Sequence, residues 1–89
     1  MINILRALAN ETRMEIMLKL YRRTDDDNVP MQEIRDELGI SKANLSQHLD
    51  VLKRVNAVIV TPTGRTSLVA INEKNEAIIE MMETIDRWI

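Results

Sequence analysis

The stretch from Gly39 to Arg54 constrains the fold of this chain more than any other. Its leucines recur at helical spacing and the residues opposite them are small or polar, so the stretch predicts an amphipathic helix. Ser41 is suited to cap this helix, because its hydroxyl can accept a hydrogen bond from a free amide two or three residues on. Gln47 and Arg54 point about opposite Leu45, at roughly 100° per residue. The polar face meets either water or the edges of base pairs.

A short helix and a tight turn are predicted immediately before this stretch. Pro30 fits the first turn of a helix, where its missing N–H costs nothing, and Met31, Ile34 and Leu38 give that helix one apolar side. Gly39 ends it in the left-handed conformation. Two short helices joined by a three- or four-residue turn with a glycine are typical of a helix-turn-helix motif. We place this motif at about residues 31–54.

The pattern after Arg54 changes to that of a β-hairpin. Residues 58–61 and 67–71 are apolar and rich in β-branched side chains, and residues 62–65 supply turn chemistry. We expect a hairpin at about residues 58–71 with its tip at residues 63–66.

Three more helices complete the expected order. Apolar spacing predicts a short first helix, and Asn10 suits the cap of a second helix from about Glu11 to Arg23. Asn72 is expected to cap a last helix at about residues 73–88. The chain of 89 residues is therefore predicted to be one mainly α domain, residues 1–89, in the order α-α-α-α-β-β-α.

The charge of the chain is unevenly distributed. Its net charge of −2 alone argues weakly against nucleic acid as a partner. Residues 41–66 are nevertheless net positive, because they hold four cations and one acid: Lys42, Lys53, Arg54, Arg65 and Asp50. Contact with phosphates needs a local positive patch rather than a basic chain, so this segment keeps DNA among the possible partners.

Composition excludes several other classes. The absence of cysteine excludes disulfides, thiolate metal sites and thiol redox sensing. The sequence also lacks a histidine pair, a glycine-rich phosphate loop and a nucleophile–base set, so we do not expect an enzyme or a cofactor. No apolar run approaches ~18 residues and no secretory signal pattern is present. We expect a cytoplasmic protein without a membrane partner.

Two motifs resemble those of a known family. Residues 8–13, Leu-Ala-Asn-Glu-Thr-Arg, resemble the L-A-D-P-T-R signature of ArsR/SmtB winged helix-turn-helix repressors. Residues 40–49 with Leu52 and Lys53 resemble the recognition-helix pattern S-x-x-x-[VL]-S-x-H-L-x-x-L, and residues 58–71 occupy the place of the wing. The resemblance implies a winged helix-turn-helix fold. It also implies a homodimer that binds a palindromic operator and dissociates from it when an effector binds.

The chain departs from the metal-sensing members that it resembles. Those members carry cysteines in the third helix or a His/Asp/His/Glu set in the last helix. Here residues 31–36 hold no thiol and the expected last helix has no histidine. The metal response therefore does not carry over.

The expected DNA-binding residues lie on the Gly39–Arg54 stretch and the hairpin tip. Amides such as those of Asn44 and Gln47 can pair with adenine in the major groove, and Arg65 on a projecting turn suits the minor groove or its phosphates. Ordinary solvated polarity is the alternative for each. The full set is Ser41, Lys42, Asn44, Ser46, Gln47, Lys53, Arg54 and Arg65.

Two residues that match the family motifs are expected to have other functions. His48, the only histidine, is interpreted as a helix-packing or phosphate-bonding residue, and Arg13 as a partner of an acid or a cap of another element. The acidic row of the last helix and Asp25–Asp27 are interpreted as solvated surface, since neither shows the spacing of a calcium loop.

The two ends of the chain are rich in apolar side chains. A monomer could fold the last helix back on its own core, or the first and last helices could form a symmetric dimer interface. The second hypothesis assigns to that interface Ile2, Leu5, Met81, Met82, Ile85 and Trp88.

The leading functional hypothesis is a homodimeric, sequence-specific DNA-binding transcriptional regulator, a repressor, on double-stranded DNA. The alternative is a winged-helix module for protein–protein interaction without a DNA target, which an acidic pI near 5.3 leaves open. Salt separates them, because binding to phosphates weakens steeply as the salt concentration rises.

Overall fold

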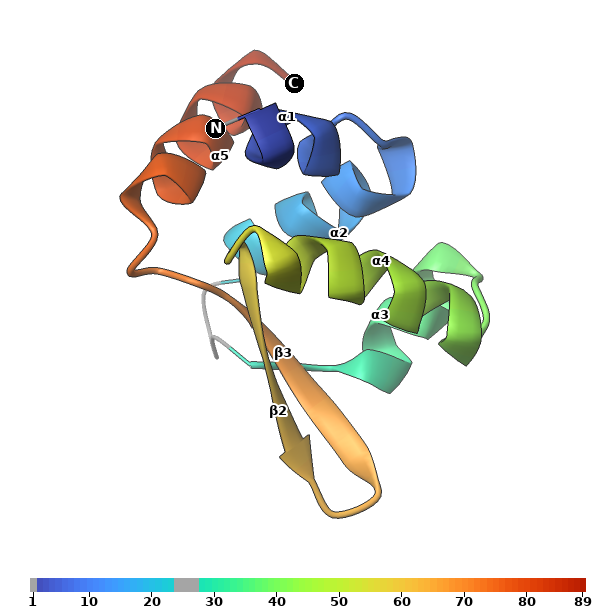
Figure 1. Cartoon of the computed structure of the whole chain (residues 1–89). Coiled ribbons are helices and arrows are strands. Elements are labelled where there is room, and N and C mark those ends of the chain that lie inside the picture. Colours follow the sequence, from blue (N-terminus) through green and yellow to red (C-terminus); the bar gives the residue numbers. More distant parts are fainter. Residues whose placement is uncertain (1, 24–27) are drawn as a thin grey trace.

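The computed structural model of the chain describes residues 2–23 and 28–89, and for Ile2 the backbone alone. This part contains five α-helices and three β-strands (Figure 1). In chain order they are α1 (Ile2–Leu8), α2 (Glu11–Tyr21), β1 (Val29–Pro30), α3 (Met31–Leu38), α4 (Lys42–Arg54), β2 (Val58–Thr63), β3 (Thr66–Ile71) and α5 (Glu76–Trp88). Helices α1 and α5 lie at one end of the molecule, and the β2–β3 hairpin projects from the other (Figure 1).

Helix α2 is the centre of the fold. Its apolar set is wide, and Ile16, Met17 and Leu20 are all buried, because α2 contacts α1, α4, α5 and β3 at once. The largest fully buried side chains come from almost every element and form one core: Ile16, Met17, Val29, Ile34, Leu45, Leu52, Val69, Ile78 and Met82. The five helices and the β2–β3 hairpin that follows α4 confirm the expected fold class, a winged helix-turn-helix.

The helix-turn-helix is formed by α3 and α4. Gly39 follows α3 with φ 65°, and its N–H donates to the Arg35 carbonyl. The side chain of Ser41 then accepts a hydrogen bond of 3.0 Å from the Asn44 N–H and caps α4. A non-glycine residue is strained at such a φ, so Gly39 permits the short turn that sets α4 at its angle to α3.

The hairpin belongs to a three-stranded antiparallel sheet in the order β1-β3-β2. Its register runs from Val58 opposite Ile71 to Thr63 opposite Thr66, with Gly64 at φ 64° in the tip. The tip therefore lies where the sequence predicts it. The third strand, β1, was not predicted; Val29 and Pro30 pair with Val69 and Leu68 of β3.

Three predicted boundaries are wrong. Pro30 is the N-cap of α3 rather than part of its first turn, since it still has the extended conformation of β1. Helix α2 ends at Tyr21 rather than at Arg23. Asn75, not Asn72, caps α5 by accepting a hydrogen bond from the Ile78 N–H. In the described part of the chain, no helix is long and apolar enough to cross a membrane.

Candidate nucleic-acid interface

Helix α4 has one apolar and one polar face, as expected. Leu45, Leu49 and Leu52 are at most 2% exposed and hold the helix against the core. The opposite face is exposed to solvent and carries Ala43 and Gln47, with Asn44 at its edge, and Lys42 is exposed in the first turn of the helix. Because the leucines fix the rotation of α4 about its axis, they also fix the direction in which these polar side chains leave the surface.

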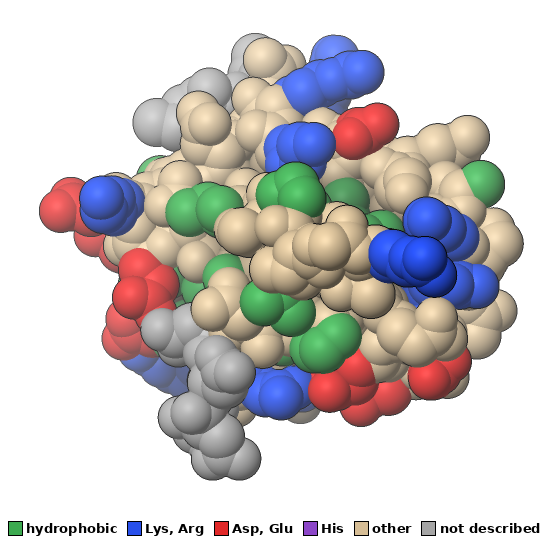
Figure 2. Space-filling view, turned by 90° about the horizontal axis from the view of Figure 1, so that it is seen from below, with side chains coloured by type: hydrophobic (Ala, Val, Ile, Leu, Met, Phe, Trp, Pro, Cys, Tyr) green, Lys and Arg blue, Asp and Glu red, His purple; other side chains and the backbone are tan. Residues whose placement is uncertain are grey.

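Lys42 and Arg65 are brought together by the structure although 23 positions separate them in sequence. Both line a small cleft of about 120 Å³ between α3, the start of α4 and the hairpin, and Arg35 of α3 lines it with them. The sequence interpretation missed Arg35, because no pattern near it in the sequence indicates that this helix residue lies beside the hairpin. In Figure 2, several Lys and Arg side chains gather at one edge of the face that includes the hairpin tip.

Ser46 and Lys53 lie in a neighbouring cleft between α4 and the hairpin, which Val60 and Ser67 also line. Ser46 is half-buried there, so it flanks the exposed face of α4 on the side of the hairpin. The Lys53 ammonium lies 3.7 Å from an Asp50 carboxylate oxygen, and both side chains are at least half exposed. An exposed pair of this kind stabilises by less than about 1 kcal/mol, so Lys53 remains available to a phosphate.

Arg54 lies apart from the other expected DNA-binding residues. It lines a separate groove of about 330 Å³ between α1 and the end of α4, together with Arg6 and Arg13. The eight residues of the expected DNA-binding set therefore do not form one cluster.

Arg13 and His48 connect three helices. The Arg13 Nε donates to the Ala7 carbonyl at 2.6 Å, and its Nη1 lies 3.2 Å from Nδ1 of His48. Arg13 thus caps the end of α1, which is one of its two expected functions, while no acid is its partner among the described residues. Burial and the nearby Arg13 charge lower the pKa of His48 below its usual value.

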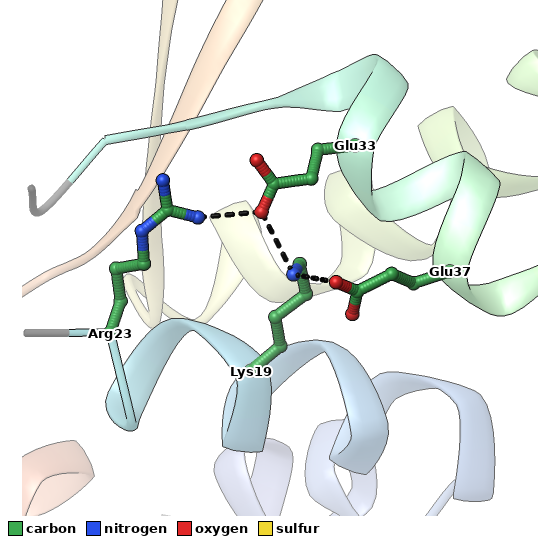
Figure 3. A network of polar contacts seen from close by, with 4 residues as sticks. All are labelled: Lys19, Arg23, Glu33 and Glu37. Atoms are coloured by element: carbon green, nitrogen blue, oxygen red, sulfur yellow. Dashed lines mark hydrogen bonds and ion pairs between the residues drawn. The ribbon is translucent and has the colours of Figure 1, made fainter.

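A network of ion pairs fixes α3 against α2 (Figure 3). The Lys19 ammonium lies 2.7 Å from a Glu37 oxygen and 3.0 Å from a Glu33 oxygen, and Arg23 also donates to Glu33. Burial opposes the charge on Lys19, but its bonds to Glu37 and Glu33 together outweigh this and raise its pKa. Hydrogen bonds from Lys19 and Arg23 lower the pKa of Glu33. The positive charges of Lys19 and Arg23 are therefore neutralised within the protein.

The expected dimer residues divide into two groups. Leu5 and Trp88 are 59% and 80% exposed, and Leu5, Met81 and Ile85 line an apolar groove of about 560 Å³ between α1 and α5. Met82 was assigned wrongly, because its side chain is fully buried in the core of the monomer. The side chain of Ile2 lies outside the described residues.

Acidic side chains of the described helices are partly paired. Asp86 accepts a hydrogen bond of 2.6 Å from Arg22, and Glu83 lies 3.4 Å from Arg87. No group of three His, Cys, Asp or Glu side chains that could hold a metal ion occurs within residues 2–23 and 28–89. The Asp25–Asp27 run lies outside these residues.

Comparison with known proteins supports the fold. A family model described as a helix-turn-helix domain matches residues 8–61. No curated protein gives a significant match. Among solved structures, HlyU from Vibrio cholerae N16961 is similar with a TM-score of 0.84 and 26% sequence identity, over 98% of this chain and 88% of that chain.

Two further structures have the same architecture. The transcriptional regulator HlyU from Vibrio vulnificus CMCP6 gives a TM-score of 0.80 at 25% identity, over 98% of this chain and 84% of that chain. An ArsR family transcriptional regulator gives a TM-score of 0.73 at 20% identity, over 97% of this chain and 87% of that chain. This likeness is one of fold alone. Since the family model covers more than half of the sequence, the chain belongs to the helix-turn-helix domain family, and it is an ArsR/SmtB-like winged helix-turn-helix regulator.

Proposed function

We propose that the protein is a homodimeric, sequence-specific DNA-binding transcriptional regulator that acts as a repressor. The observation that carries this proposal is the exposed polar face of α4, with Asn44 and Gln47 directed away from a fully buried leucine face. An α-helix fits the major groove of B-DNA, where amide side chains can pair with adenine. Helix α4 is therefore the recognition helix of this proposal.

The hairpin supplies the second contact with the duplex. It projects beyond the helices (Figure 1), and Arg65 in its tip is exposed. A guanidinium so placed suits the narrow, negative minor groove or the phosphates beside it. Contacts from Ser41, Ser46 and Lys53 to phosphates would fix the register of α4 without reading sequence.

Dimerisation rests on the apolar groove between α1 and α5. Leu5 lines this groove and is more than half exposed, as are Trp88 and Ile89 at the C-terminal end of α5. Exposed apolar surface of this kind marks interaction sites. A two-fold interface here would use the same surface of both subunits. It would present two recognition helices to half-sites about 34 Å apart on one side of the duplex.

Repression and its control follow from the resemblance to ArsR/SmtB proteins. A dimer on a palindromic operator would be released by an effector, and thiolates cannot sense that effector because the chain holds no cysteine. We therefore propose that release does not depend on thiolate-bound metal.

Selection of bound duplexes from a random DNA pool tests the proposal. The expected result is an inverted repeat with half-sites one helical turn apart and an affinity that falls steeply with salt. A protein–protein interaction module would instead enrich no sequence, and its residual retention of DNA would not depend on the bases. The mass of the complex, measured by sedimentation, then gives the number of subunits on each site.

A further inference from the structure

We propose that the cleft between α3, the start of α4 and the hairpin holds one phosphate of the DNA backbone, and that Arg35 binds this phosphate together with Lys42 and Arg65. The inference rests on the proposed DNA-binding function and assigns to it a site and a residue, Arg35. It concerns contact with the backbone, in contrast to the base contacts proposed for Asn44 and Gln47.

The cleft has the size and the lining of an anion site. Its volume is about 120 Å³, and the residues that line it carry three cations and hydroxyl groups but no acid among those described: Met31, Gln32, Arg35, Lys42, Arg65, Thr66 and Ser67. Lys42 is also the first residue of the 13-residue α4. The positive end of the helix dipole therefore adds to the field of the three side chains.

The cations of this cleft differ in their partners from those at the C-terminal end of α2 and directly after it. Lys19 and Arg23 are paired with Glu33 or Glu37, and Arg22 is paired with Asp86. Within the part of the chain that the structure describes, Arg35, Lys42 and Arg65 make no ion pair. The positive charge of the cleft is thus uncompensated, whereas that at the C-terminal end of α2 is neutralised.

Arg35 supplies the most specific observation. Its Nη1 donates to the Gln32 side-chain oxygen at 3.1 Å, while its Nε is buried and has no hydrogen-bond partner among the described residues. A buried donor without an acceptor destabilises a protein, and more so when the group is charged. Phosphate oxygens in the cleft would supply the missing countercharge and would accept from the terminal N–H groups of Arg35, since a guanidinium binds phosphate through two parallel donors.

The three cations come from three different elements, α3, α4 and the hairpin tip. One phosphate in the cleft would therefore contact the helix-turn-helix and the wing at the same time. It would fix where α4 lies along the major groove relative to the hairpin tip.

The test compares Arg35→Met with Lys74→Met on a duplex selected from the random pool. Both variants lose one cation, but Lys74 lies in the segment between β3 and α5, away from the hairpin tip (Figure 1). Arg35→Met is expected to lower the affinity about tenfold, the loss of one charge-assisted hydrogen bond, and to reduce the salt slope by about one. Lys74→Met is expected to change the affinity less than twofold.

A neutral methylphosphonate placed at each backbone position in turn locates the phosphate. Wild-type protein should lose affinity at one position of each half-site, and Arg35→Met, Lys42→Met and Arg65→Met should all be insensitive to the substitution at that same position. Arg35→Lys, which retains the charge, should restore part of the affinity. Because the buried Nε has no partner, Arg35→Met should melt no lower than the wild type.

The outcomes separate this inference from the proposed function. Wild-type protein that binds no duplex overturns both. Wild-type protein that binds, with Arg35→Met binding equally well or with the three variants insensitive at different phosphates, overturns the inference and leaves the proposed function standing.

Discussion

The guanidinium of Arg13 lies 3.2 Å from Nδ1 of His48, so that one hydrogen bond joins α2 to α4. Arginine has no acceptor and stays protonated, and therefore His48 must accept at Nδ1 and carry its proton on Nε2. A second proton would remove the acceptor and place two cations together. The same arginine caps α1, so a change at His48 reaches both the helix that borders the apolar groove and the helix proposed to bind DNA.

We predict that this pair makes the protein less stable in mild acid. Burial and Arg13 lower the pKa of His48 in the folded state below its ordinary value of 6.5. Its stabilising effect is complete above that value. As the pH falls below it, the unfolded chain takes up a proton that the folded chain refuses, so the free energy of unfolding decreases until the lower folded pKa is passed.

Urea unfolding at a series of pH values between about 7 and 5 measures this effect. His48→Asn keeps an acceptor near the Nδ1 position and cannot titrate, so its unfolding free energy should vary less over this range. Since the sequence has no other histidine, an equal slope in the variant would mean that another group is responsible.

Gln47→Ala is predicted to relax the recognition of one base pair. Gln47 is exposed and alanine is the better helix former, so the melting temperature should not fall. Binding to the selected duplex should weaken by about 1–3 kcal/mol. Titration with duplexes mutated one base pair at a time checks this, and random duplex serves as the control. An unchanged preference at every position would show that Gln47 reads no base.

Leu5→Glu is predicted to separate the dimer and leave the monomer folded. Leu5 is 59% exposed in the described monomer, so a charge there costs the monomer little but would be buried in an interface over the groove. Sedimentation should give a monomer with unchanged helical circular dichroism. Ile59→Glu is the matched control, because Ile59 is 49% exposed and lies on β2; this variant should remain dimeric.

Met82→Glu should behave differently from Leu5→Glu. Its side chain is fully buried beside the rest of the core, and burial of an unpaired carboxylate unfolds small domains. A Met82→Glu variant that is folded and monomeric would contradict the assignment of Met82 to the monomer core.

Asn75→Ala is predicted to destabilise the protein by about 1–2 kcal/mol, the cost of losing a helix cap. Asn75 accepts from the Ile78 N–H, and its amide donates to the Asn56 carbonyl at 3.1 Å. It therefore caps α5 and fixes the start of that helix to the end of α4. Asn75→Asp keeps the cap and loses the donor, so urea unfolding should place it between the wild type and Asn75→Ala.

The parts of the fold that follow from local patterns could be predicted. Leucine spacing identified α4, the glycine at Gly39 identified the turn, and two β-branched runs identified the hairpin. These signals are contained within single elements. Asn72 and Asn75 are both good caps followed by an acidic residue, but Asn72 is held to the segment after α4, where its N–H donates to the Ala57 carbonyl and its amide to the Asn56 carbonyl.

The features that could not be predicted depend on contacts between distant segments. Pairing of Val29 with Val69 creates β1, and a two-residue strand has no periodicity of its own. The apolar stripe of α5 shows that the helix packs, but not that Met82 faces the core while Met81 borders the groove. Arg35 enters the candidate site only because the start of β3 packs beside α3.

Strand β1 couples the helix-turn-helix to the hairpin, the two parts that would contact the duplex. Pro30 pairs with Leu68 of the hairpin and is also the residue from which α3 starts, so a tilt of the hairpin displaces the helix-turn-helix with it. We therefore expect the protein to set the distance between the DNA contacts of α4 and those of the hairpin tip. The nucleic acid must then adjust its groove width and curvature to meet both. Base pairs that no side chain touches would then influence affinity through their stiffness.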